Sequence, residues 1–348
     1  MKDFARFRHR FHEFGGWRLV RAYARMGVLG TGVCALARCA VGRRSLKEAY
    51  PAITRRIDRL LLRRYLPVLH SCVAGESGPP PGRESDARVP RIVWTAWLQG
   101  VSEAPPLVRA CWASVSQALP DYEMRVVTAG NIGQWVTLPD DIVRKYRRGR
   151  IPQAMMADLV RLAVLERYGG VWVDASVLCT GFGNEQLRLR WAAIEQAPLT
   201  IFRYFQRGRR QAIGLSNWFI AARRHSPVVG AVLKMLLAYW HDFDCAVDYY
   251  VCHLFLGEAL RAFPREREPM PRENSFHSLL LGQAFGRDFD AVAWDDLVTH
   301  VSFHKLGYRS VARAMANPKS YCAWVLVHYR PAQGRDLRWN SNEPVKSQ

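Results

Sequence analysis

Apolar runs and helical repeats alternate along the middle of this chain. Val89–Leu98 is a short apolar run around Pro90, and Tyr122–Thr128 and Val171–Val173 are two more. Short apolar runs bounded by glycine or polar residues predict buried strands. Val108–Gln117 lies between the first two runs and has helical spacing. Because helix and strand signals alternate, we expect an α/β fold with a parallel sheet flanked by helices.

The strongest helical signal is Pro152–Tyr168. Pro152 suits the start of a helix because its missing N–H would have no partner there. Gly169 and Gly170 end the pattern, and a strand signal follows at once. Pro227–Trp240 predicts another amphipathic helix. The apolar positions that repeat in the first helix are Met155, Leu159, Leu162, Ala163 and Leu165.

A basic helical pattern precedes these elements. Arg55–Leu69 places the apolar residues Ile57, Leu60, Leu61 and Leu66 among five arginines. Such helices lie on membrane surfaces or bind partners, and a solvated helix packed on the main domain has the same pattern. The five arginines are Arg55, Arg56, Arg59, Arg63 and Arg64.

Composition suggests where the domains divide. Pro79–Pro81 stand among Gly, Ser and charged residues, which is typical of a linker. We expect a basic helical region over 1–72, a linker over 73–88, a main domain over 89–335 and a flexible tail over 336–348.

The charge of the chain is strongly positive. Its 348 residues contain 50 Lys and Arg against 30 Asp and Glu, and the net charge is +20. Residues 1–70 hold 16 of the basic side chains and four of the acidic ones. A basic face attracts nucleic acid, an anionic membrane leaflet or an acidic polymer. With 49% hydrophobic and 23% charged residues, the composition is globular and excludes disorder and collagen.

The sequence predicts neither a membrane-spanning helix nor a disulfide or zinc framework. The longest uncharged runs, Met26–Ala37 and Gln211–Ala222, have about a dozen residues, whereas a spanning helix needs about 20. Met1–Phe14 is charged throughout, so we expect no signal peptide. The eight cysteines form no Cys-x-x-Cys pair, which predicts buried free thiols in a reducing cytoplasm.

The chemistry is concentrated in Ala157–Gly181. Asp158 and Arg161 are three apart and share a helix face. After the glycine pair, a short strand ends at Asp174. Ligands of open α/β sheets bind at the carboxyl ends of strands, and a carboxylate there can hold a divalent cation that neutralises a diphosphate. A single Asp after a strand is also common as a turn or cap residue.

Four blocks in order carry a family resemblance. They are IVWTAWLQG (92–100), IPQAMMADLVRLAVLERYGGVWVDASV (151–177), SNWFIAARRHSPVV (216–229) and SFHKLGYR (302–309). Together they resemble the capsular polysaccharide synthesis family of bacterial glycosyltransferases, which is related to the DXD-motif sugar transferases.

The resemblance implies a fold and an activity. The fold would be a GT-A-like, Rossmann-type nucleotide-sugar-binding sheet flanked by helices, with a basic helical N-terminal extension. The activity would be hexosyl or related transfer from a nucleotide sugar, with UDP favoured, to a glycan or lipid-linked acceptor in surface polysaccharide synthesis. Mn²⁺ or Mg²⁺ would assist, and the anomeric configuration would be retained.

The resemblance also implies residue roles. Thr95 and Trp97 would lie near the base or ribose of the donor, and Asp158 and Arg161 would contact the donor itself. Asp174 would be the first Asp of the DXD motif and, with Arg161, part of the catalytic set.

One departure from the motif is visible, because Ser176 stands where the second Asp would be. Either Asp174, Ser176 and His304 would then hold the metal with the diphosphate, or the affinity for a metal would be low; Lys305 would neutralise the diphosphate. Asn217 and Asp248 are the candidates for the acceptor side of the catalytic site.

Three hypotheses follow. The first is a cytoplasmic transferase docked by residues 1–70 on the inner face of a bacterial membrane. The second is a catalytically inactive transferase-like scaffold, which the missing carboxylate allows. The third is a nucleic-acid-binding protein; charge permits it, but no zinc-finger spacing or RNP-like motif supports it, and we expect no nucleic acid partner.

Overall fold

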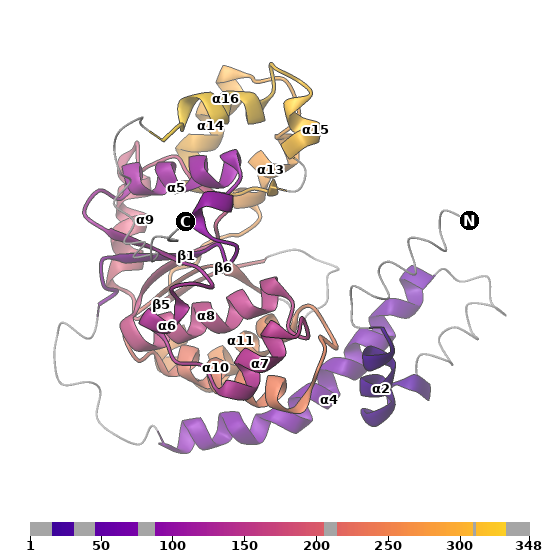
Figure 1. Cartoon of the computed structure of the whole chain (residues 1–348). Helices are drawn as coiled ribbons and strands as arrows, with labels where there is room; N and C mark the ends of the chain where they lie inside the picture. Colours follow the sequence, from indigo (N-terminus) through magenta and orange to yellow (C-terminus); the bar gives the residue numbers. More distant parts are fainter. Residues whose placement is uncertain (1–15, 31–45, 76–87, 205–213, 309–310, 332–348) are drawn as a thin grey trace, which may run out of the picture.

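A computed structural model describes residues 16–30, 46–75, 88–204, 214–308 and 311–331 (Figure 1). The predicted 336–348 tail and most of the predicted 73–88 linker lie outside these ranges. The predicted boundary at residue 72 falls inside helix α4, which continues to Gly75.

The centre of the molecule is a five-stranded sheet in the order β2-β1-β3-β6-β5. Strand β1 is parallel to both β2 and β3, whereas β6 is antiparallel to β3 and β5 is antiparallel to β6. The α/β fold with a helix-flanked sheet is confirmed. The strands are β1 (Ile92–Ala96), β2 (Glu123–Val127), β3 (Gly170–Val173), β5 (Leu199–Arg203) and β6 (Leu215–Ala222).

The expectation that the sheet is parallel is correct for only three of its strands. Residues 204–214 join β5 to β6, and a connection this short suits antiparallel neighbours, because a parallel crossover takes a dozen or more residues. The sheet is therefore mixed.

Helices cover both faces of the sheet (Figure 1). Successive strand residues point to opposite faces, so Trp94 and Trp172 join one buried cluster while Val93 and Val171 join another. The first face is covered by α8 (Gln153–Tyr168), α10 (Pro227–Asp242) and α11 (Val251–Ala262), and the second by α5 (Pro106–Ala118) and α9 (Glu185–Gln196).

Helix α4 (Leu46–Gly75) packs along α10 and α11. Its apolar side chains Ile57, Leu61 and Leu69 are buried in the core on that side. Arg64 Nε and the Tyr65 hydroxyl each donate to Asp242 Oδ2 at 2.8 Å. The apolar face of α4 is thus used for packing and is not open to a lipid surface, whereas Arg55, Arg59 and Arg63 remain exposed.

A second, two-stranded sheet joins β4 (Val177–Cys179) to β7 (Phe303–Lys305) in antiparallel register. Short helices near the C-terminal end of the described chain pack beside it (Figure 1). The remaining elements are α2 (Trp17–Arg25), η2 (Val101–Glu103), α6 (Ile132–Trp135), α7 (Asp140–Arg147), α12 (Pro264–Arg267), η3 (His277–Leu279), α13 (Leu280–Ala284), α14 (Ala291–His300), α15 (Val311–Met315) and α16 (Tyr321–His328).

The predicted glycine pair connects α8 directly to β3. Gly169 and Gly170 have φ values of 65° and 103°, in the region that favours glycine. A Cβ on Gly170 would lie 2.5 Å from the Ile92 carbonyl oxygen. A larger residue at this position would therefore push β1 and β3 apart. The pair therefore fixes where β3 ends and where Asp174 lies.

All six cysteines in the described part of the chain are free thiols, and five of them are buried. The predicted free thiols are found at all six positions and the predicted burial at five, since Cys72 is half-buried. Cys34 and Cys39 lie outside the described residues.

Candidate active site

An open cleft of about 950 Å³ lies at the edge of the sheet where β1 and β3 end. Parallel strands bring their carboxyl ends to one edge, so Trp97 and Asp174 both line it. Antiparallel β6 contributes Asn217 near its beginning, and α8 contributes Asp158 and Arg161 from its first half and its middle.

Asp174 is held in a turn that leaves β3. Its backbone N–H donates to the Trp218 carbonyl at 2.9 Å, and its own carbonyl accepts from Val177 N–H at 3.0 Å. The carboxylate Oδ1 accepts from Arg161 Nη2 at 2.8 Å and from Trp172 Nε1 at 2.9 Å. The carboxylate is therefore fixed in position at the floor of the cleft.

Arg161 joins the two acidic residues of the cleft. Nη1 donates to Asp158 Oδ1 and Nη2 to Asp174 Oδ1, and the guanidinium lies 4.9 Å from the centre of the Trp172 ring. The Arg161 side chain is only 4% exposed. Asn217 Nδ2 adds a hydrogen bond of 2.9 Å to the same Asp158 oxygen. The planar fork of arginine suits this double contact.

Lys305 completes the cluster from β7. Its Nζ donates to Asp174 Oδ2 at 2.9 Å and to Ser176 Oγ at 3.0 Å. The Ser176 hydroxyl donates in turn to the Leu306 carbonyl at 2.9 Å. Two carboxylates and two cations thus balance one another in a partly buried setting.

The environment shifts the pKa of each carboxyl differently. Burial raises the pKa of Asp158 to about 6, although Arg161 opposes the shift. Burial acts on Asp174 in the same sense, but Lys305 and Arg161 outweigh it and hold its pKa below the ordinary value. Asp174 therefore stays ionised at neutral pH, while Asp158 titrates not far below it.

Two cleft residues on or beside α11 were not predicted from the sequence. His253 is 7% exposed, and its Nδ1 has no hydrogen-bond partner among the described residues. Burial and the neighbouring Arg161 lower its pKa to about 3, so the imidazole is neutral at pH 7. Tyr249 stands at the rim with 53% of its surface exposed. No local motif marks either residue, because packing of α11 on β6 brings them here.

Seven of the predicted site residues line this cleft, and three do not. Thr95 is buried within β1, and Asp248 accepts from Tyr250 N–H at 2.7 Å outside the cleft. His304 is fully buried, and its Nε2 lies 3.1 Å from Thr180 Oγ1. Adjacent residues of a strand point to opposite sides, so Lys305 faces the cleft and His304 does not. The seven are Trp97, Asp158, Arg161, Asp174, Ser176, Asn217 and Lys305.

The donor set does not fit a resident divalent cation. Mg²⁺ and Mn²⁺ prefer several free oxygen ligands, but both Asp174 oxygens and the Ser176 oxygen already accept hydrogen bonds from cationic or indole donors. Among the described residues, no three His, Cys, Asp or Glu side chains gather closely enough to hold a metal.

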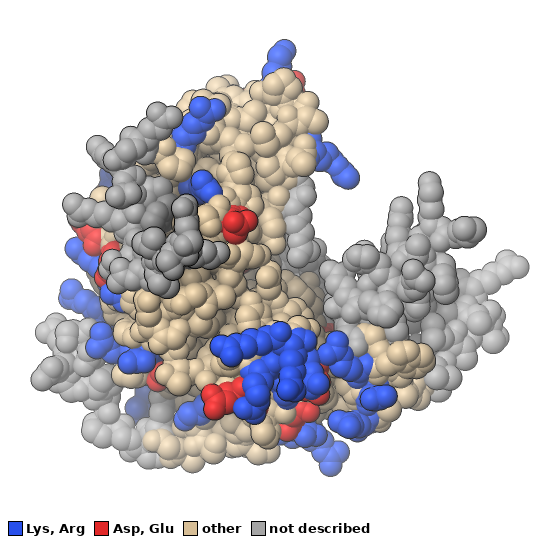
Figure 2. Space-filling view, in the orientation of Figure 1, with Lys and Arg blue, Asp and Glu red and all other residues tan. Residues whose placement is uncertain are grey.

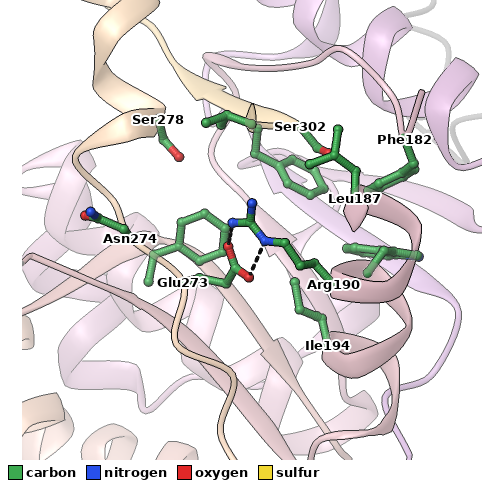
Figure 3. A pocket seen from close by; sticks show the side chains of 12 residues that line it. Phe182, Leu187, Arg190, Ile194, Glu273, Asn274, Ser278 and Ser302 are labelled. Atoms are coloured by element: carbon green, nitrogen blue, oxygen red, sulfur yellow. Dashed lines mark hydrogen bonds and ion pairs between the residues drawn. The ribbon is translucent and has the colours of Figure 1, made fainter. Parts of the chain in front are cut away.

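A smaller cavity lies elsewhere, beside α9 (Figure 3). Its walls are mainly apolar and aromatic, and Arg190 pairs with Glu273 inside it. Glu273 also holds β5, since its carbonyl accepts from Arg203 N–H at 2.8 Å. None of the predicted site residues lines this cavity, and its ion pair links elements of the fold.

The family model described as capsular polysaccharide synthesis protein matches residues 80–324. The match covers most of the chain and contains Asp158, Arg161, Asp174, Asn217 and Lys305 of the cleft. The chain belongs to this family.

Two curated relatives match the chain over shorter stretches. The chain is 28% identical over 173 residues to glycosyltransferase afumC of Aspergillus fumigatus, across 47% of this chain and 41% of that protein. It is 26% identical over 159 residues to O-glycosyltransferase braB of Annulohypoxylon truncatum, across 42% of this chain and 37% of that protein. The chain thus spans about two fifths of the length of each relative.

Among solved structures, the PaToxG glycosyltransferase aligns with a TM-score of 0.36 at 12% sequence identity, covering 61% of this chain and 87% of that one.

In the described residues, none of the helices is both long and apolar enough to cross a bilayer.

Proposed function

We propose that this chain is a glycosyltransferase that moves a hexosyl or related sugar from a nucleotide-sugar donor, UDP-linked by preference, to a glycan or lipid-linked acceptor in surface polysaccharide synthesis. Membership of the capsular polysaccharide synthesis family supports this proposal. The printed names of the two curated relatives support sugar transfer in general. UDP preference, and transfer with retention, rest on family resemblance.

One observation carries the proposal: Arg161 and Lys305 meet at Asp174 in an open cleft at the carboxyl edge of the sheet. Sugar transfer breaks the bond between the anomeric carbon and a phosphate oxygen, and the electron pair stays on the nucleoside diphosphate. Cations fixed beside that oxygen stabilise the developing charge. The acceptor hydroxyl forms the new bond and loses its proton.

The rest of the cleft suits a sugar. Asn217 and the neutral His253 offer uncharged hydrogen-bonding groups beside the cations. Trp97 and Tyr308 meet edge to face at 5.3 Å between ring centres and form an aromatic wall. Aromatic surface next to polar groups is typical of sites that hold a ring with hydroxyls.

A thermal-shift screen of nucleotide sugars tests this function. A ligand at a hundredfold excess over its Kd stabilises the folded state by about 2.7 kcal/mol. We expect one donor class to raise the melting temperature. A duplex DNA arm belongs in the same screen; uniform melting temperatures with all sugar nucleotides, and a salt-dependent shift with DNA, would contradict the proposal and favour nucleic acid binding.

We also propose that the protein docks on an anionic membrane surface through its basic N-terminal side. A groove of about 1610 Å³ lies between α2, α4 and the end of α10. Arg64 and Lys145 in its wall are paired with Asp242 and Asp244. In the part of the chain that the structure describes, four further groove arginines are without an ion-pair partner: Arg18, Arg21, Arg25 and Arg63.

Basic residues also gather next to this groove. The last turn of α7 carries Arg144, Lys145 and Arg147, and Figure 2 shows a large patch of Lys and Arg on the face where Figure 1 places α7. A phosphate-bearing leaflet complements such a surface. Docking there would bring the protein to a lipid-linked acceptor on the inner face of a bacterial membrane.

A further inference from the structure

Lys305 contacts both side chains that the Asp-Ala-Ser turn could offer to a divalent cation. Its Nζ lies 2.9 Å from Asp174 Oδ2 and 3.0 Å from Ser176 Oγ. Asp174 Oδ1 is taken by Arg161 and Trp172. The point between the two motif side chains is therefore occupied by an ammonium group.

The backbone fixes this ammonium in place. Lys305 is the register partner of Val177 in the two-stranded sheet, directly after the turn. Leu306 N–H donates to the Ser176 carbonyl at 2.8 Å, and Ser176 Oγ donates back to the Leu306 carbonyl at 2.9 Å. A strand, and not a free loop, therefore brings the lysine to the turn.

The occupied point is a poor site for a metal. A divalent cation bound to Asp174 Oδ2 and Ser176 Oγ would stand close to the Lys305 ammonium and would be repelled by it. The neighbouring Arg161 guanidinium adds a second positive charge. The same two charges attract a diphosphate.

We propose that Lys305, with Arg161, takes the part of a divalent cation in this cleft: the ammonium binds the donor diphosphate and stabilises it as the leaving group, so that donor binding requires no metal ion. This inference rests on the proposed function. An ammonium has three N–H donors, and two are used by Asp174 and Ser176, so the third is available to a phosphate oxygen.

The transfer step balances without a further reactant. The bond from the anomeric carbon to the phosphate oxygen breaks, and its electron pair stays on that oxygen next to Lys305. The acceptor oxygen forms the new bond to the anomeric carbon. Its proton passes to the released diphosphate.

Calorimetric titration of the full chain with UDP, GDP and their sugar derivatives, in EDTA and again in Mn²⁺, tests this inference. We expect one nucleotide to bind with the same Kd in both buffers. Lys305→Met should weaken that binding about tenfold or more in EDTA, because a charge-assisted hydrogen bond to phosphate is lost. Lys319→Met, a change at an exposed lysine, should leave the Kd unchanged.

Electron paramagnetic resonance of Mn²⁺ gives a second, independent readout. When wild-type protein is added to Mn²⁺ and UDP, the spectrum should stay the same as that of the Mn²⁺–UDP complex in buffer. The double variant Lys305→Met, Ser176→Asp should capture the ion, because it removes the ammonium and supplies a second carboxylate. Folding of each variant is checked by circular dichroism.

The outcomes separate the two proposals. Binding to the wild type that EDTA abolishes and Mn²⁺ restores would overturn the metal-free inference and leave the transferase function standing. Unchanged affinity in Lys305→Met would also overturn the inference. No binding of any nucleotide in either buffer would overturn both.

Discussion

Asp158 is the side chain whose charge is most sensitive to pH in the cleft. The bonds from Arg161 and Asn217 both reach its Oδ1, which leaves Oδ2 to carry a proton. Its pKa of about 6 lies above the ordinary value because the carboxyl is buried. Protonation below that pH removes one negative charge from the site and leaves the cations of Arg161 and Lys305 facing the ionised Asp174 alone.

This charge change predicts how donor binding depends on pH. As the pH falls through about 6, a nucleotide sugar should bind about threefold to tenfold more tightly, since its bridged diphosphate does not itself titrate there. His253, with a pKa of about 3, does not titrate in this window. Calorimetry between about pH 5 and about pH 8 measures the effect.

Asp158→Asn is the matched control for that titration. The variant has no carboxyl to protonate, so its Kd should be flat with pH and close to the low-pH value of the wild type. A wild-type Kd that is independent of pH, or a variant that keeps the dependence, would show that Asp158 is not the titrating group.

The site could be predicted where its residues are close in sequence. Asp158, Arg161 and Asp174 follow from helical spacing and from the end of a strand, and Lys305 from a family resemblance. His253 and Tyr249 could not be found this way, because only the packing of α11 against the sheet brings them to the cleft. The opposite directions of His304 and Lys305 cannot be predicted from the sequence, because a strand of three residues is too short for its alternation to be recognised.

At the scale of elements, the passage from α8 to β3 determines where the site forms. Gly170 has a φ of 103°, and an added Cβ would meet the Ile92 carbonyl oxygen at 2.5 Å. The two strands that carry Trp97 and Asp174 to the cleft are neighbours at this point. Gly170 therefore positions Asp174 only through the backbone, by letting β1 and β3 approach each other closely.

Gly170→Ala should lower the free energy of unfolding by about 2–3 kcal/mol, from backbone strain and displacement of β1. Gly230→Ala is the control: Gly230 lies in α10, where a Cβ would have only an ordinary contact of 3.7 Å with Glu166, and alanine should stabilise the helix by about 0.5–1 kcal/mol. Urea unfolding measures both. Equal stabilities of the two variants would contradict this account of the turn.

Helices with a long apolar repeat and strands bounded by glycine or polar residues could be predicted from the sequence. The helix predicted over Pro152–Tyr168 corresponds to α8, and the three predicted strands correspond to β1, β2 and β3. Strands β4 and β7 have three residues each, too few for a period to be recognised. The reversed direction of β5 and β6 depends on pairing between distant segments, which periodicity does not encode.

At the scale of the whole molecule, the sequence concentrates positive charge in residues 1–70, and the described residues show a basic patch on the face that carries α7 (Figure 2). Packing of α4 on α10 and α11 buries its apolar face, so attraction to a membrane would be electrostatic. Such attraction weakens as salt is added.

Changing Arg18, Arg21, Arg25 and Arg63 to Glu should release the protein from phosphatidylglycerol vesicles in a sedimentation assay, since each basic residue contributes about 1 kcal/mol at such a surface. These arginines have no ion pair to break among the described residues, so the fold should be kept. A matched change of the four exposed arginines Arg188, Arg224, Arg272 and Arg313, which do not line the groove, is the control. Unchanged sedimentation of the groove variant would reject docking.

Nucleotide-sugar turnover in the wild type and in two aspartate variants shows whether Asp174 organises a transferase site. The donor is the one that the thermal-shift screen selects, and release of nucleoside diphosphate is followed. Asp174→Asn, which loses the carboxylate that holds Arg161 and Lys305 in position beside the leaving diphosphate, should lower the rate about a hundredfold or more. Asp296→Asn, at an exposed position of α14, should leave it unchanged. Turnover that survives in folded Asp174→Asn, or that is lost equally in both variants, would contradict the account.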